Sequence, residues 1–125
     1  ESSKNEFLKY LEEALKENYN ETYTDGHIKL PISETITLQT GIEKTKAFIT
    51  LYKNGWKKIN ELEKEKVFSK LQGSEQYNSQ WQKPTWNGYA TLDIFTTESK
   101  EFLNVEENVE LVVQAIDSIV KQLKV

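Results

Sequence analysis

The sequence predicts a single α+β domain, in which helices pack on one face of a mainly antiparallel sheet of four or more strands. Segments of period-two alternation indicate strands, and the last twenty or so residues carry apolar side chains at helical spacing. Between them, residues 45–71 combine a buried strand with a following amphipathic pattern, and we expect the other segments to pack around this stretch. The expected order of elements is α-β-β-β-α-β-α.

The first part of the chain contains one helical pattern and two alternating ones. Ser3-Lys4-Asn5-Glu6 has the form of a capping box, and apolar residues at helical spacing follow it. The polar stretch after this helix ends in Asp25-Gly26, a turn signal. The predicted elements are a helix over residues 4–18, a turn over 18–26, strands over 27–30 and 35–40, and a turn over 41–44.

The second part begins with the strand at residues 45–53, which Asn54-Gly55 interrupts. We predict a helix over residues 56–71, with Trp56 in the core and with its lysines and glutamates on a solvated face. Residues 74–88 are irregular and polar, and residues 89–97 predict another strand. The closing helix follows a second capping-box pattern at Asn104. Its apolar face consists of Val109, Val112, Val113, Ile116, Ile119, Val120 and Leu123.

Composition limits the classes of protein that fit. With 125 residues, 37% hydrophobic and 29% charged, the chain can form one domain with a substantial core, residues 1–125. The sequence shows neither a membrane-spanning run nor a signal-peptide pattern. Because it contains no methionine, we expect it to be excised from a longer chain. Its lack of cysteine fits the cytoplasm, which we favour, and also fits extracellular bacterial proteins.

The charged residues disfavour recognition of duplex DNA. Lysine supplies all 16 basic side chains, and the net charge is −4. Arginine is the usual bidentate partner of guanine and phosphate, so its absence argues against a sequence-reading surface. A local group of lysines could still contact phosphates, so nucleic acid stays a disfavoured alternative.

Catalytic patterns are weak. His27 is the only histidine and no cysteine accompanies it, so we interpret it as a turn residue rather than a metal ligand or base. Glu98-Ser99-Lys100, with Asp93 upstream, has the residue types of a metal-dependent nuclease. Glu98 and Lys100 however lie past the expected end of the strand, and Asp93 is only five residues before Glu98 on that same strand. We therefore predict no enzyme, no catalytic or metal site and no cofactor, with the nuclease as the alternative.

Aromatic residues in the irregular segment are the best candidate for a binding surface. The candidate binding residues are Tyr77, Trp81, Lys83, Trp86 and Tyr89. Large apolar side chains in a polar segment serve either as a recognition surface or as the contacts that fold the loop onto the sheet. For the first case we expect a protein partner or another domain of the parent chain. A secreted or surface-attached bacterial module is a further alternative.

A set of spaced, mainly hydrophobic residues runs through most of the chain: Phe48-Ile49-Thr50-Leu51-Tyr52, then Asn54, Ile59, Leu62 and Lys66, then Trp81, the strand at residues 90–95 and the closing helix. In this pattern the chain, from about His27 to its end, resembles a domain of unknown function carried C-terminal to restriction-endonuclease-like modules in bacterial defence proteins. The resemblance implies an accessory, non-catalytic domain of a defence or nuclease protein.

Overall fold

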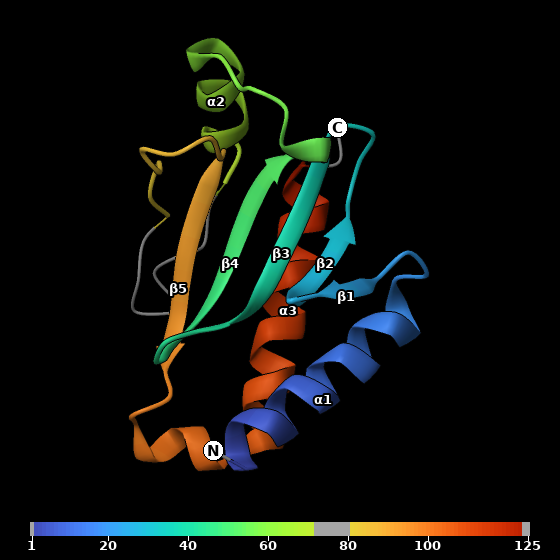
Figure 1. Cartoon of the computed structure of the whole chain (residues 1–125), viewed down its shortest axis with the longest axis vertical. Helices are drawn as coiled ribbons and strands as arrows, with labels where there is room; N and C mark the ends of the chain where they lie inside the picture. The colour runs from blue at the N-terminus through green and yellow to red at the C-terminus, as the bar shows by residue number, and fades with distance from the viewer. Residues whose placement is uncertain (1, 72–80, 124–125) are drawn as a thin grey trace.

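The protein is an α+β domain built on one sheet. The computed structural model describes residues 2–71 and 81–123, and Figure 1 shows the arrangement of its elements. In chain order they are α1 (Ser2–Asn18), β1 (Tyr23–Asp25), β2 (His27–Pro31), β3 (Ile36–Glu43), β4 (Lys46–Lys53), the 3₁₀ turn η1 (Asn54–Trp56), α2 (Glu61–Phe68), β5 (Ala90–Thr96), the 3₁₀ turn η3 (Lys100–Leu103) and α3 (Val105–Leu123).

The sheet is an antiparallel meander. Its five strands lie in the order β1-β2-β3-β4-β5, and every neighbouring pair is antiparallel. Leu38 of β3 faces Leu51 of β4, which in turn faces Ala90 of β5, so β4 is paired on both sides. The predicted fold class is confirmed.

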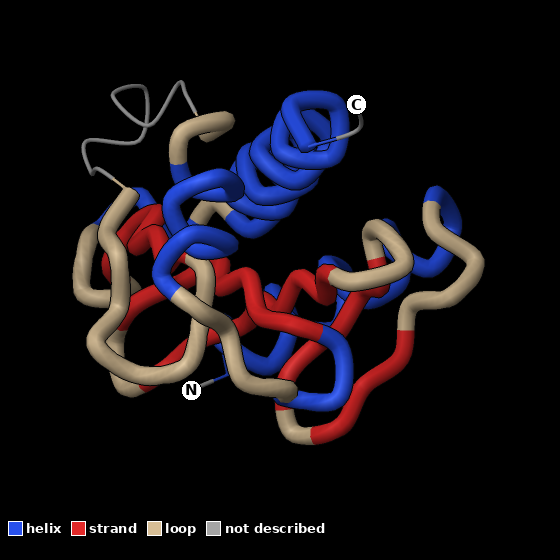
Figure 2. Tube along the Cα trace, turned by 90° about the horizontal axis from the view of Figure 1, so that it is seen from above, coloured by secondary structure: helices blue, strands red, loops and turns tan. Residues whose placement is uncertain are grey.

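Helices α1 and α3 cover one face of this sheet and form the core with it. Figure 2 shows α3 on one side of the strands. Phe7 and Leu11 of α1 and Ile116 of α3 are fully buried in one cluster with the inward side chains of the strands. That cluster includes Ile28, Leu30, Leu38, Ile49, Leu51 and Leu92. None of the helices in the described part of the chain is long and apolar enough to cross a membrane.

Strand β4 divides its side chains between two environments. Ile49 and Leu51 point into the helix-covered core and are fully buried. Phe48, Thr50 and Tyr52 alternate with them and therefore lie on the opposite face. In Figure 1 that face is turned to the viewer and α3 runs behind it. We call it the open face; it carries the site described below.

Three boundaries in the first part of the chain differ from the sequence prediction. Residues 23–25 form the short edge strand β1 where a turn was expected, because they pair with β2 across Gly26. Strand β3 continues to Glu43, so the hairpin turn is at Lys44 and Thr45 and not at residues 41–44. Helix α1 begins at Ser2, which places Ser3 inside the helix instead of at its cap.

The predicted helix over residues 56–71 is wrong at its start. Helix α2 begins after Asn60, whose side chain accepts from the Glu63 backbone N–H at 2.8 Å while the Glu63 carboxylate accepts from the Asn60 backbone. This capping box fixes the first turn five residues later than expected. Trp56 is consequently not a core residue, since its side chain is 46% exposed. Lys64, expected on a solvated face, is instead 9% exposed.

Stability should separate the true core from the misassigned tryptophan. Ile116→Ala should lower the free energy of unfolding by about 2–5 kcal/mol, because it leaves a cavity between α3 and the sheet. Trp56→Ala should cost only about 1 kcal/mol, the scale of one exposed aromatic contact. Urea unfolding of both variants and the wild type checks this order. Equal midpoints for the two variants would contradict it.

Candidate functional site

The structure separates the residues expected to form one aromatic surface. Trp86 is 44% exposed, but Tyr89 is only 2% exposed and belongs to the core. Trp81 is half-buried against that core. Lys83 is exposed and forms an ion pair with Glu65. Tyr77 lies outside the described residues. Of the four described residues, only Trp86 is part of the cleft described next.

The residues of the nuclease alternative lie on β5 and in the segment directly after it. Asp93 lies on β5 and pairs with Lys46 of β4 at 3.5 Å. Glu98 and Lys100 are exposed and follow the same strand, in the turn and in η3. In residues 2–71 and 81–123, no group of three or more acidic, histidine or cysteine side chains is placed to hold a metal ion.

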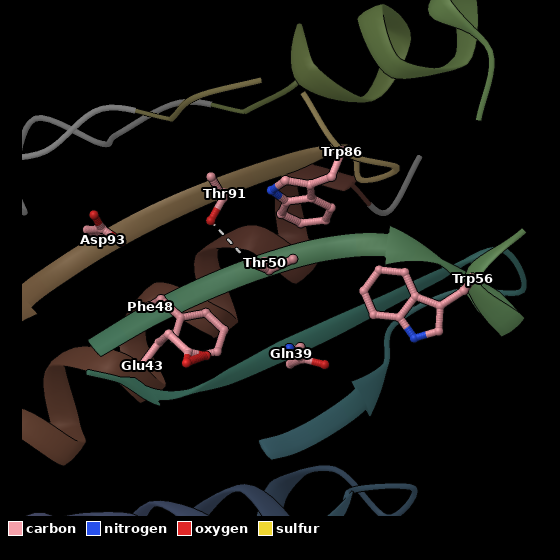
Figure 3. A pocket seen from close by; sticks show the side chains of 8 residues that line it. All are labelled: Gln39, Glu43, Phe48, Thr50, Trp56, Trp86, Thr91 and Asp93. Atoms are coloured by element: carbon pink, nitrogen blue, oxygen red, sulfur yellow. Dashed lines mark hydrogen bonds between the residues drawn. The ribbon is translucent and has the colours of Figure 1, made fainter. Parts of the chain in front are cut away.

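A cleft of ≈ 390 Å³ crosses the open face along β4, and it is the candidate site (Figure 3). This volume is in the range of sites that bind small molecules or short segments. Strands β3, β4 and β5 and two loops contribute its lining, which consists of Gln39, Glu43, Phe48, Thr50, Trp56, Trp86, Thr91 and Asp93. Aromatic rings and polar groups make up this lining, and among the described residues it contains neither an aliphatic side chain nor a cation.

Two indoles form one end of the cleft. The Trp56 ring stacks on Tyr52 with centroids 3.8 Å apart and planes 6° from parallel. The Trp86 ring follows at 6.3 Å from Trp56, tilted by 56°. Tyr52 is 3% exposed beneath this stack, whereas each indole keeps almost half of its surface open. The three rings therefore form a continuous aromatic ridge whose outer part is in solvent.

Trp56 is held in an unfavourable backbone conformation. Gly55 and Trp56 have φ angles of 72° and 56°, both in the left-handed region. Glycine enters this region freely, but a bulky residue does so at a cost of about 1–3 kcal/mol. Asn54, directly before Gly55, anchors the start of this turn: its amide donates to the Glu34 carbonyl at 2.8 Å, and its Oδ1 accepts from Thr37. The local fold thus turns Trp56 back over Tyr52.

The loop with Trp86 is tied to the segment after Trp56. The Asn87 amide donates to the carbonyls of Trp56 and Lys57 at 3.2 and 3.0 Å. Its Oδ1 accepts from the Ile59 N–H at 2.9 Å. One side chain therefore makes three hydrogen bonds across two loops that are about thirty residues apart in the sequence. These bonds fix the two indoles relative to each other.

Buried Lys64 and Gly88 complete this support. The Lys64 ammonium donates to the Pro84 carbonyl at 3.0 Å and to the Trp86 carbonyl at 3.4 Å. A buried charge is costly unless it is hydrogen-bonded, so these carbonyls define the position of the loop. Gly88 leaves room for the ring: a Cβ there would lie 2.1 Å from the Trp86 indole.

The floor and the far end of the cleft are polar. Thr50 and Thr91 join β4 to β5 through a hydroxyl contact of 3.0 Å, shown in Figure 3. At the end away from the indoles stand the carboxylates of Glu43 and Asp93, whose side chains are 67% and 51% exposed. His27 Nε2 lies 3.7 Å from the Glu43 carboxylate. With the indoles at one end and these carboxylates at the other, the cleft has an aromatic end and an acidic end.

Burial changes the acidity of Tyr52. Loss of solvent beneath the indole raises the pKa of the Tyr52 phenol to about 12, and Tyr23 and Asp25 add to the effect. The neutral phenol is therefore the form that fits the ridge.

Sequence reasoning found Trp86 but missed the other parts of the cleft. Phe48 and Thr50 were placed on the central strand without a decision on which face they occupy. Trp56 was assigned to the helix. The signal that was available is the Asn-Gly pair before Trp56, which ends a strand and permits a left-handed turn.

The chain matches no protein-family model, no curated protein and no solved structure. The cleft must therefore be interpreted from its own chemistry.

The raised pKa of Tyr52 predicts a loss of stability in alkali. The folded state holds the phenol proton more tightly than the unfolded chain, where the pKa is about 10. This contribution is fully present below about pH 10 and is lost as the pH rises through about 12. Between these values, the free energy of unfolding should fall less steeply in Tyr52→Phe than in the wild type. The measurement is the free energy of unfolding from urea titrations at each pH. Parallel curves of this free energy against pH for the two proteins would contradict the assignment.

Proposed function

We propose that this domain is a non-catalytic recognition module that binds an extended polypeptide segment in the cleft on its open face. The segment belongs to a partner protein or to another domain of the parent chain. In this proposal the domain plays the accessory role that the resemblance to domains of bacterial defence proteins implies.

The observation that carries the proposal is the support given to two exposed indoles. Exposed tryptophans alone are ordinary, because much of any protein surface is apolar. Here a positive φ at Trp56, the three hydrogen bonds of Asn87 and the buried ammonium of Lys64 all maintain the exposed ridge. Backbone strain and buried polar groups of this kind concentrate at functional sites. Tryptophan is also among the residues that dominate binding energy at protein interfaces.

A polypeptide fits the cleft better than a nucleic acid does. Single-stranded nucleic acids also stack on aromatic side chains, but they require cations along their backbone. Within residues 2–71 and 81–123, the lining offers two carboxylates and no lysine. A peptide laid along residues 48–52 of β4 would extend about 13 Å, or some four to five residues at strand spacing. That length favours recognition of a short linear segment.

Binding should depend on the indoles and not on exposed apolar surface in general. The test is a selection from a display library of random peptides about seven residues long on the immobilised 125-residue chain. We expect it to yield peptides whose affinity falls by about tenfold or more in Trp86→Ala. Gly88→Ala should weaken them as well, because it displaces the indole without removing it. Fluorescence anisotropy of the recovered peptides gives the affinities.

The matched control is Leu62→Ala, which removes a side chain that is 80% exposed on α2, outside the cleft lining. It should leave the affinities unchanged. Circular dichroism and urea midpoints of all variants show whether the fold is retained. Peptides that bind Trp86→Ala and the wild type equally, or a selection that recovers none, would overturn the proposal.

The proposal also predicts that the domain does not cleave DNA. Plasmid incubated with the protein and magnesium or manganese should remain supercoiled, because the described residues place no group of three or more acidic, histidine or cysteine side chains to hold a metal ion. Agarose electrophoresis detects a single nick per plasmid. Cleavage that Glu98→Ala abolishes would favour the nuclease alternative instead.

A further inference from the structure

We infer that the segment bound in the cleft is basic, with an arginine or lysine seated at the acidic end; this inference rests on the proposed recognition of a polypeptide. Two independent features of the lining select for positive charge. One is the pair of carboxylates, and the other is the pair of indole faces.

The carboxylates lie on adjacent sides of β4. Glu43 ends β3 and Asp93 lies on β5, opposite Phe48 of β4. Both are more than half exposed, so a cation entering the cleft reaches them without first displacing a buried partner. Lys46 contacts Asp93 at 3.5 Å, and His27 contacts Glu43 at 3.7 Å. In these contacts two carboxylates share a single lysine, Lys46.

The indoles favour the same type of ligand. The faces of tryptophan rings attract ammonium and guanidinium groups, arginine most often. The aliphatic stems of arginine and lysine also pack on such rings while the charged head stays hydrated. The indoles are therefore compatible with a basic peptide, whereas an acidic peptide would meet repulsion from Glu43 and Asp93.

The floor suits an extended backbone between these ends. Thr50, Thr91 and Gln39 present hydroxyl and amide groups between the ridge and the carboxylates. The expected segment thus has an apolar or aromatic residue near Trp56 and Trp86, and its basic residue several positions away. The order of these two residues in the peptide sequence would then set the direction of the peptide on the sheet.

Charge substitutions on both partners test the inference. The probes are the peptides selected on the wild-type chain, and copies in which every arginine and lysine is replaced by serine. The double variant Glu43→Gln, Asp93→Asn should lower the affinity for the basic peptides by about five- to tenfold, as expected for the loss of two exposed ion pairs. The same variant should not affect the serine copies. Raising the salt concentration should reproduce this loss for the wild type.

Lys46→Gln provides a test of opposite sign. It removes the cation that competes for Asp93, so it should strengthen basic peptides about two- to threefold. A purely structural role of these side chains would not produce a gain. The double variant and Lys46→Gln both change exposed groups, so we expect both to fold, and their urea midpoints check this.

The outcomes separate the inference from the proposed function. If Trp86→Ala abolishes binding while the charge variants and serine copies behave like the wild type, the cleft binds peptides but the basic segment is wrong. If the selected peptides are neutral or acidic, the inference fails in the same way. If no peptide depends on Trp86, both the inference and the proposed function fail.

Discussion

The alternation of side chains along β4 is the constraint on which the whole molecule depends. Ile49 and Leu51 must reach the layer formed by α1 and α3, so Phe48, Thr50 and Tyr52 must face the other way. Because β4 is paired on both sides, a slip of one residue would exchange the two sets and place Thr50 in the apolar core. The packing that stabilises the fold therefore also places the floor of the cleft.

Polar groups, rather than apolar packing, determine how the aromatic ridge is presented. Asn87 joins the two loops, Lys64 holds the carbonyls beside Trp86, and Asn54 anchors the turn before Trp56. A ligand that meets rings already in position loses less conformational entropy than one that must order them. The unfavourable φ of Trp56 raises the free energy of the folded state in order to keep the indole exposed, and the stack on Tyr52 offsets part of that cost.

The fold was predictable from the sequence to the extent that periodicity controls it. The alternation in β2, β3, β4 and β5 and the apolar face of α3 are properties of single segments, and all five elements were located with small shifts at their ends. Strand β1 was missed because three residues carry too little periodicity, and it forms only by pairing with β2.

The candidate site was less predictable because it depends on contacts between distant segments. Trp56 has apolar spacing with Ile59, which suggested a helix, while the capping box at Asn60 delays the helix. Tyr89 and Trp86 have similar composition around them, yet one enters the core and the other stays exposed. Lys64 lies in a run of lysines and glutamates, and only the position of the Pro84 carbonyl distinguishes it from its neighbours.

The meander order of the sheet has a consequence for how the chain folds. Strands β1 to β4 are consecutive in sequence and in space, so their hairpins close short loops and can form early. The apolar face that includes Ile49, Leu51 and Leu92 is completed only by α3, which follows all five strands in the sequence. During synthesis, part of this face therefore stays exposed until α3 has been made. The nascent protein is consequently most prone to aggregation just before α3 emerges, and it gains its core late.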